Sequence, residues 1–235
     1  MGEIDTREHL IRTAERLFAE HGIGAVSLRR INQAAGQKNA SALHYHFGSR
    51  EALIDAIFAY RMTGVNRRRL ALLDAIAPQG AANAPAGGAA RDARLRPVVE
   101  SIVLPLAEQI DDGTGGSHYI RFLAQAYSDP AIDVAAIIGG KYDAGLQRAN
   151  RMLRDILTGA LPAEIVDRRL RLMAANTVYS LADRERQISA VATARDGANL
   201  PLFVADLVDS MVGALSAPVS ATTAAQLAES RRRSA

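Results

Sequence analysis

The chain has no cysteine and no tryptophan, and aromatic residues make up only 5% of its 235 positions. Without cysteine, disulfides and thiolate metal sites are excluded, and an intracellular, reducing location is expected. No run of about 18 apolar residues is present, so no transmembrane helix and no membrane partner are expected. The first ten residues also lack the basic start and apolar core of a signal peptide. These absences predict a cytoplasmic protein.

Sequence motifs of common enzymes are missing as well. The chain contains no G-x-S-x-G, no H-E-x-x-H and no Walker loop with its lysine. The Gly-Gly-Lys at 139–141 lacks the other residues of a phosphate loop, and the Asp-Asp-Gly at 111–113 is too short for a calcium loop. The sequence therefore predicts no enzymatic activity, no cofactor and no metal site.

Charge is distributed unevenly along the chain. The formal net charge is +3, from 28 Lys and Arg against 25 Asp and Glu. Eleven of these basic residues but only seven of the acidic ones lie in residues 1–70, so the remainder is close to neutral. A basic small end on a near-neutral large end suits a DNA reader joined to a sensing or assembly domain. An ordinary solvated helix surface explains the same charges equally well.

Helical spacing of apolar residues begins near the N-terminus. Hydrophobic residues form 49% of the chain, and the abundance of Ala and Leu favours helices over sheets. Asp5 and Glu8 have the spacing of a capping box, and Gly22 is suited to end the first helix. One face of this helix is expected to carry Leu10, Ile11, Ala14, Leu17 and Phe18.

The stretch from Ser27 to Glu51 has the outline of a helix-turn-helix. Ser27 is placed to cap a second helix, with Val26 and Ile31 at the spacing of a hydrophobic staple. The small residues at 34–36 allow two helices to approach closely around a turn. The spacing then predicts a third helix over 40–47.

The third helix is expected to be anchored by Leu43 and Phe47, which are four residues apart. Ser49 is placed to cap a long fourth helix over 50–76, which ends before a proline. The segment 78–90 is rich in Gly, Ala and Pro and is expected to be a loop or linker.

In this order, the signals resemble the N-terminal domain of TetR-family transcriptional regulators. The most specific is the stretch LHYHFGSREAL at 43–53, which is similar to the end of the family's recognition helix. The resemblance covers about a quarter of the chain. One departure is that the spacing from Gly36 to Leu43 is one residue longer than the common pattern, which is expected to seat the recognition helix differently.

The resemblance implies an all-α fold, with an N-terminal three-helix helix-turn-helix DNA-binding domain and a larger C-terminal helical ligand-binding and dimerisation domain. It implies a bacterial, ligand-responsive repressor that binds a double-stranded DNA operator as a homodimer and lies at the nucleoid when bound. The effector would be an unknown small molecule. The alternatives are a helical interaction protein without DNA binding, and an enzyme.

Ten residues are expected to contact DNA. A recognition helix needs small or polar side chains at its N-terminal end, where it faces base edges. Helix N-termini favour phosphates, and the basic Arg50 in such a first turn suggests a phosphate partner. The expected base readers are Arg29, Lys38, Asn39, Ser41 and Ala42, the last against a thymine methyl; the expected phosphate anchors are Ser27, His46 and Arg50; by the resemblance, His44 and Tyr45 face the groove and the backbone.

Each of these assignments has a plainer alternative. Tyr45 is also compatible with core filling, and Arg29 with a solvated face. A metal pair formed by His44 and His46 is disfavoured, because residues two apart on a helix point to different faces.

The rest of the chain reads as helices near 94–111, 116–128, 130–158, 163–183 and 201–216. The expected domains are 1–50 for DNA binding, with the fourth helix as a link, and 51–219 for ligand binding and dimerisation. Residues 220–235 are expected to be a disordered, solvated tail, with DNA contact by its arginines as the alternative.

Dimerisation and effector binding are both assigned to this larger part. By the resemblance, the helices near 163–183 and 201–216 form a four-helix dimer interface. Arg121 would be costly if it were buried without a partner, so it is expected to pair with Asp129 or Asp133, or to bind an anionic ligand. The residues expected to line the effector pocket are His118, Arg121, Phe122, Gln125, Asn176 and Tyr179.

Overall fold

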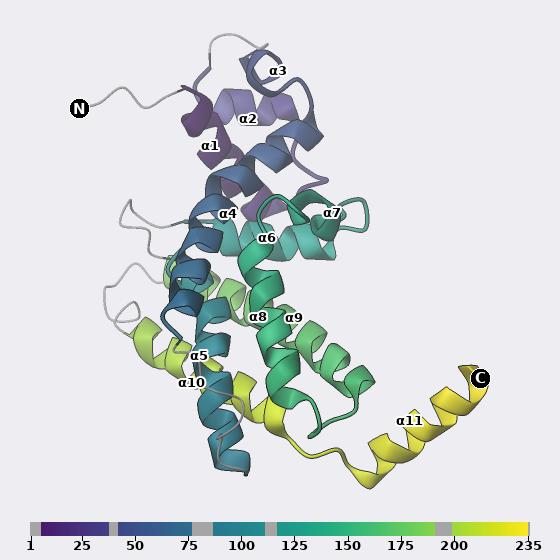
Figure 1. The fold of residues 1–235 in the computed structure, drawn as a ribbon. Coiled ribbons are helices and arrows are strands. Elements are labelled where there is room, and N and C mark those ends of the chain that lie inside the picture. The colour runs from purple at the N-terminus through teal and green to yellow at the C-terminus, as the bar shows by residue number, and fades with distance from the viewer. Residues whose placement is uncertain (1–5, 38–41, 77–86, 111–116, 191–198, 235) are drawn as a thin grey trace.

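The computed structural model describes residues 6–37, 42–76, 87–110, 117–190 and 199–234. These residues form helices and no named strand, which confirms the all-α prediction (Figure 1). The helices are α1 Thr6–His21, α2 Leu28–Ala34, α3 Ala42–Phe47, α4 Arg50–Asp74, α5 Gly88–Ala107, α6 Tyr119–Ser128, α7 Val134–Ile138, α8 Ala144–Leu157, α9 Ala163–Ala190, α10 Leu200–Ser216 and α11 Ala221–Ser234.

Helices α1 to α3 lie at one end of the molecule, and α4 runs from them into the larger bundle (Figure 1). In that bundle α5 packs against α4, α8 and α10, while α6 packs against both α1 and α9. The buried apolar side chains form one continuous cluster from Leu10 in α1 to Leu215 in α10. The two parts therefore share a core, and α4 and α6 are the helices that join them.

The single helix expected over 130–158 is wrong, because the structure divides it into α7 and α8. Gly140 has a φ of +71°, in the left-handed region that favours glycine. Its N–H donates to Oδ1 of Asp143 at 3.0 Å, which closes the turn before α8. The helix over 163–183 is also longer than expected, since α9 continues to Ala190.

The expectation of a disordered tail is wrong for residues 221–234, which form α11. Figure 1 shows this helix projecting from the end of α10. Its attachment is an ion pair in which Nε and Nη2 of Arg231 donate to the two carboxylate oxygens of Glu164, both at 2.8 Å. This contact ties the end of the chain to the start of α9.

No single helix in the described segments is long and apolar enough to cross a membrane. Helices α10 and α11 reach that length and composition only as a pair, which is bent by 58°.

Candidate DNA-binding face and effector cavity

A buried asparagine holds the turn between α2 and α3. Asn32 is 4% exposed, and its Oδ1 accepts a hydrogen bond from the backbone N–H of Leu43 at 3.3 Å. Ile31 and Leu43 are buried beside this bond and anchor the two helices. The bond therefore fixes how α3 is presented. Asn32 was not among the expected functional residues. The signal for it in the sequence is its position next to the core residue Ile31 in α2.

The outer face of α3 is aromatic and polar. Tyr45 has an exposed fraction of 85%, which rules out core filling. The ring of His46 lies edge-on to it, with centroids 5.2 Å apart. His44 is exposed, and its Nδ1 lies 2.9 Å from the carbonyl oxygen of Gly48, at the C-terminal end of α3. His44 therefore also closes the helix that carries it.

Both serines expected to cap helices do so. The Oγ of Ser27 accepts from the N–H of Arg30 at 3.2 Å, and the Oγ of Ser49 accepts from the N–H of Ala52 at 3.1 Å. Each cap satisfies one of the free N–H groups at a helix start. Arg29, in the first turn of α2, is exposed.

The proposed reading of bases near the start of α3 receives less support. Ala42 is 8% exposed and so offers little surface to a thymine methyl, which corrects the expectation for this residue. Lys38, Asn39 and Ser41 lie outside the described residues, as does most of the turn with its extra residue.

Arg50 is turned inward, which corrects its assignment as a phosphate anchor. Its Nη1 donates to the carbonyl oxygen of Ile23 and its Nη2 to that of Val26. The guanidinium also lies over the ring of Phe18, 6.0 Å from the centroid. Arg50 therefore ties the start of α4 to the loop between α1 and α2.

A buried ion pair joins α1 to α4. Nε and Nη2 of Arg61 donate to Glu15 at 2.7 and 2.9 Å, and the two side chains are 6% and 2% exposed. Glu15 also accepts from the backbone N–H of His118 at 3.2 Å, just before α6. One carboxylate of the helix-turn-helix domain thus contacts both helices that join it to the larger part.

A second carboxylate holds the start of α6 from the other side. Glu185 of α9 is 1% exposed and accepts from the N–H groups of Ile120 and Arg121 at 3.4 and 2.9 Å. Burial raises the pKa of Glu185 to about 7, although these hydrogen bonds and the Arg121 guanidinium act against the rise. The N-terminal end of α6 therefore lies between a carboxylate of α1 and one of α9, where the helix dipole favours negative charge.

Arg121 does pair with a protein acid, as expected, but the acid is neither of the two named. Its Nε lies 3.2 Å from Oε2 of Glu185, in place of a pair with Asp129 or Asp133. Arg121 is thereby engaged in the attachment of α6 to α9. Sequence spacing could not identify this partner, because it lies 64 residues away along the chain.

The six residues expected to form the effector pocket do not converge on one cavity. Phe122 is a core residue, with its ring 5.3 Å from that of Phe58. Desolvation lowers the pKa of His118, which faces Glu20 at 3.8 Å. Arg121 lies beside Glu185, and Gln125 is exposed near Gly22. Asn176 is hydrogen-bonded to Ser180, and Tyr179 is hydrogen-bonded to Ser128.

A small cavity does lie inside the larger domain, among α4, α5, α6, α7, α8 and α9. Its volume is about 50 Å³. Two of its lining residues are buried polar side chains, Arg69 and Thr177, and a third, Tyr127, is 48% exposed and reaches both the cavity and the surface. The apolar walls are Met62, Ile102, Leu106, Leu123, Ile138, Leu146, Ala174 and Val178.

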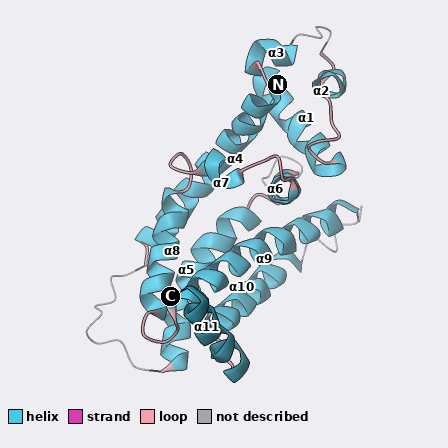
Figure 2. Cartoon of the chain, turned by 90° about the vertical axis from the view of Figure 1, so that its right-hand side faces the viewer, coloured by secondary structure: helices cyan, strands magenta, loops and turns pink. Residues whose placement is uncertain are grey.

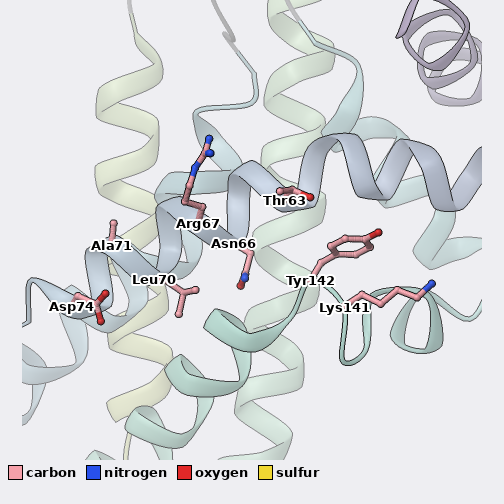
Figure 3. A pocket seen from close by; sticks show the side chains of 8 residues that line it. All are labelled: Thr63, Asn66, Arg67, Leu70, Ala71, Asp74, Lys141 and Tyr142. Atoms are coloured by element: carbon pink, nitrogen blue, oxygen red, sulfur yellow. The ribbon is translucent and has the colours of Figure 1, made fainter. Parts of the chain in front are cut away.

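A larger groove of about 500 Å³ lies at the surface, between α4 and the connection from α7 to α8. Figure 3 shows Asn66 and Arg67 leaving α4 on opposite sides, with the ring of Tyr142 near Thr63 and Lys141 extending away from Asn66. Lys141 is already paired with Asp55 at 2.9 Å. Across all described segments, no group of three or more His, Cys, Asp or Glu side chains could hold a metal ion.

Comparison with known protein families covers both parts of the chain. Residues 10–57 match the family described as bacterial regulatory proteins, tetR family. Residues 100–217 match the family described as tetracyclin repressor-like, C-terminal domain. A structure from Shewanella sp. PV-4, described as a TetR-family transcription regulator, is similar over 88% of this chain and 98% of its own, with a TM-score of 0.54 at 13% identity. That likeness shows a shared fold.

Two curated relatives are similar over less than a quarter of this chain. The HTH-type transcriptional repressor AcnR of Corynebacterium efficiens is 37% identical over 54 residues, which are 23% of this chain and 28% of that repressor. AcnR of Corynebacterium glutamicum is 38% identical over 53 residues, again 28% of its length. The chain thus matches little more than a quarter of the length of each relative.

Proposed function

Because the chain belongs to the TetR family of DNA-binding transcriptional regulators, we propose that it is a homodimeric repressor released from its operator by a small molecule. The observation that carries the DNA-binding part is the outer face of α3. Tyr45, 85% exposed, stands there on a helix whose inner side is fixed by Leu43 and Asn32. A large aromatic left in water on a rigid two-helix frame is suited to contact a partner surface.

In this proposal α3 enters the major groove, and Tyr45 and His44 contact the groove wall and backbone. Arg29 reaches the DNA from α2, where its exposed guanidinium can pair with a guanine or a phosphate. The capped helix starts at Ser27 and Ser49 present N–H groups and positive dipole ends to phosphates. Arg50 acts indirectly, by holding the α1–α2 loop.

The test is a mobility-shift titration with the DNA that flanks the protein's own gene, against a scrambled fragment, at several salt concentrations. Tyr45→Ala and Arg29→Ala should weaken binding to the flanking DNA by about tenfold or more. Arg151→Ala, an exposed arginine on α8, is the matched control and should bind as wild type does. Equal binding of both fragments, or wild-type affinity in both test variants, contradicts the docking described.

Dimerisation is proposed through the outer faces of α9 and α10, which lie side by side (Figure 2). Leu172 and Tyr179 are 69% and 46% exposed and are seven residues apart, on one stripe of α9. Leu202 of α10 is 66% exposed. Exposed apolar side chains on two adjacent helices support a four-helix interface between two copies.

Sedimentation at micromolar concentration should then give about twice the chain mass of 25.1 kDa. Leu172→Glu should shift the population towards monomer and weaken operator binding, because two half-sites are no longer held together. An exposed charge of the same kind on α8, Arg151→Glu, serves as control. A monomeric wild type would contradict the proposed interface.

Effector control is proposed to pass through α4 and α6. Both helices touch the cavity and both are bonded to the helix-turn-helix domain, α4 through Arg50 and Arg61 and α6 through the Glu15 contact. A ligand that enlarges the cavity by displacing α4 or α6 would therefore also move the contacts to the helix-turn-helix domain. The two copies of α3 would then no longer match two half-sites, which is a population shift.

A helical interaction protein without DNA binding is the second candidate. It is favoured only by the inward orientation of Arg50, which removes one expected phosphate contact. The mobility-shift titration separates the two functions, because such a protein would show no salt-dependent binding to either fragment.

A further inference from the structure

Three consecutive arginines in α4 have three different surroundings. Arg67 is exposed and lines the surface groove (Figure 3). Arg68 is about half exposed and pairs with Glu108, with Nε and Oε1 3.0 Å apart. Arg69 is 2% exposed and lines the internal cavity. Successive residues of a helix are rotated by about 100° around its axis. Three consecutive arginines can therefore face two different surfaces and the interior.

Arg69 is buried without a carboxylate. Its Nε donates to the backbone carbonyl of Ser101 at 3.2 Å, but its Nη1 is fully buried and has no hydrogen-bond partner within the described structure. Desolvation lowers the pKa of Arg69 to about 10, and the nearby hydroxyls of Tyr119 and Tyr127 act against this shift. The guanidinium therefore stays charged at neutral pH, and a buried charge that is not paired with an acid is strongly unfavourable.

A second unsatisfied polar group lines the same cavity. Thr177 of α9 is 0% exposed, and its Oγ1 has no hydrogen-bond partner in the described residues. The remaining walls are apolar except for Tyr127. A few unpaired polar groups in an otherwise apolar cavity are the usual composition of a site for a small organic molecule. In this cavity the polar groups are a cation and a hydroxyl.

We propose that Arg69 and Thr177 bind the anionic head of an organic anion, a carboxylate or phenolate with an apolar body, as the effector of the regulation proposed above. The role of the anion as effector rests on the regulation proposed above. The binding of the anion to Arg69 and Thr177 does not depend on that regulation. The head group accepts from Nη1 of Arg69 and from the hydroxyl of Thr177. The apolar body lies against Ile102, Leu106 and Val178.

The size of the cavity connects binding to movement. A volume of about 50 Å³ is close to the share of one or two water molecules, at about 30 Å³ each in the liquid. A head group that accepts from Arg69 of α4 and from Thr177 of α9 joins these two helices, so binding favours one spacing between them. The anion thus binds one arrangement of α4 better than another, which is the requirement for an effector.

The experiment uses the full-length protein and pairs of probes that differ in charge. Thermal shift and calorimetry are measured with benzoate against benzyl alcohol, and with octanoate against octanol. Each carboxylate should bind and raise the melting temperature, and each alcohol should do so at least tenfold more weakly. Arg69→Met should weaken carboxylate binding by about tenfold to a hundredfold, the range for loss of a charged hydrogen bond. Thr177→Val should weaken it by a smaller factor.

Arg67→Met is the matched control, since it removes a charge from the same helix but from the surface groove. Methionine at position 69 keeps most of the side-chain volume and removes a buried charge, so this variant should fold. Equal binding of alcohol and carboxylate, no shift with either carboxylate, or undiminished binding in Arg69→Met overturns the inference.

DNA binding is measured on the same preparations, which keeps the two proposals apart. If the flanking DNA is bound but no carboxylate binds, the anion site is wrong and the DNA-binding function stands. If carboxylates bind in an Arg69-dependent way but no DNA is bound, the site is supported and the regulatory function fails.

Discussion

Glu185 is expected to make the stability of the fold depend on pH in an unusual direction. The carboxylate is 1% exposed and accepts hydrogen bonds from the start of α6. Desolvation raises its pKa to about 7 from 4.5, and Glu15 adds to the rise, while Arg121 opposes it. The folded protein therefore binds a proton here more tightly than the unfolded chain does.

The sign and size of the effect follow from these two values. Below about pH 4.5 the carboxyl is protonated in both states, and its contribution to stability is fully present. As pH rises to about 7, the unfolded chain has lost its proton and the folded chain still holds it, so stability falls. Above that pH the loss is complete, at about 3 kcal/mol from 1.36 kcal/mol per pKa unit.

The assay compares urea unfolding of wild type and Glu185→Gln across this pH range at one fixed protein concentration. Glutamine keeps an oxygen that can accept from the α6 N–H groups but does not titrate. Desolvation also lowers the pKa of His118, because burial favours the neutral ring. The contribution of His118 to stability therefore rises with pH, opposite in sign to that of Glu185. Because His118 is present in both proteins, its effect is removed by subtraction.

The free energy of unfolding of wild type minus that of the variant should therefore fall by about 3 kcal/mol between about pH 4.5 and pH 8. A difference that stays constant within about 0.5 kcal/mol would show that Glu185 is not desolvated in the fold, and the arrangement around α6 would be wrong.

Three further outcomes are expected. Arg61→Met should destabilise the protein by about 3 to 5 kcal/mol, because Glu15 is left buried and unpaired, whereas Arg61→Met combined with Glu15→Gln should recover most of the loss in urea unfolding. Gly145→Ala should lower the melting temperature by several degrees, because the added Cβ would lie 2.8 Å from Oδ1 of Asn66. Asn32→Ala should weaken operator binding in mobility shifts without changing its salt slope, because it loosens the α2–α3 turn rather than a phosphate contact.

Local spacing was enough to predict the helix-turn-helix. Ser27 and Ser49 cap helices because a cap depends on residues two or three positions away, and the pattern shows these directly. For Arg50, local spacing was not sufficient to predict the contact. Its mismatch with the helix dipole predicted a phosphate partner, but the carbonyl oxygens of Ile23 and Val26 accept its hydrogen bonds from 27 and 24 residues away. Sequence spacing contains no information about such a contact.

The cavity was missed for a related reason. The polar and aromatic residues in and just before α6 predict an effector pocket at His118 and Phe122. Such residues on a single helix can, however, face the core or another domain equally well. The cavity takes its walls from six helices, and most of these residues are ordinary apolar positions. The sequence did not single out Arg69, because the two residues before it are also arginines and only the packing of α4 separates their surroundings.

Helix α4 carries an arginine at each place where the proposed regulation needs an attachment. Arg50 bonds to the α1–α2 loop, Arg61 to Glu15 of α1, and Arg69 faces the cavity. At 1.5 Å per residue, Arg50 and Arg69 are about 28 Å apart along the helix axis. A rigid helix of that length turns a tilt of about 5° at the cavity into a displacement of about 2 Å at its far end.

That displacement acts on the loop that begins α2. The hydrogen bonds of Arg50 carry the loop with the helix, and the Asn32–Leu43 bond carries α3 with α2. In the proposed regulation, an anion at Arg69 therefore needs no contact with the helix-turn-helix domain to reposition Tyr45. The inward orientation of Arg50 gives the DNA one phosphate contact fewer and gives the effector a mechanical connection to α3.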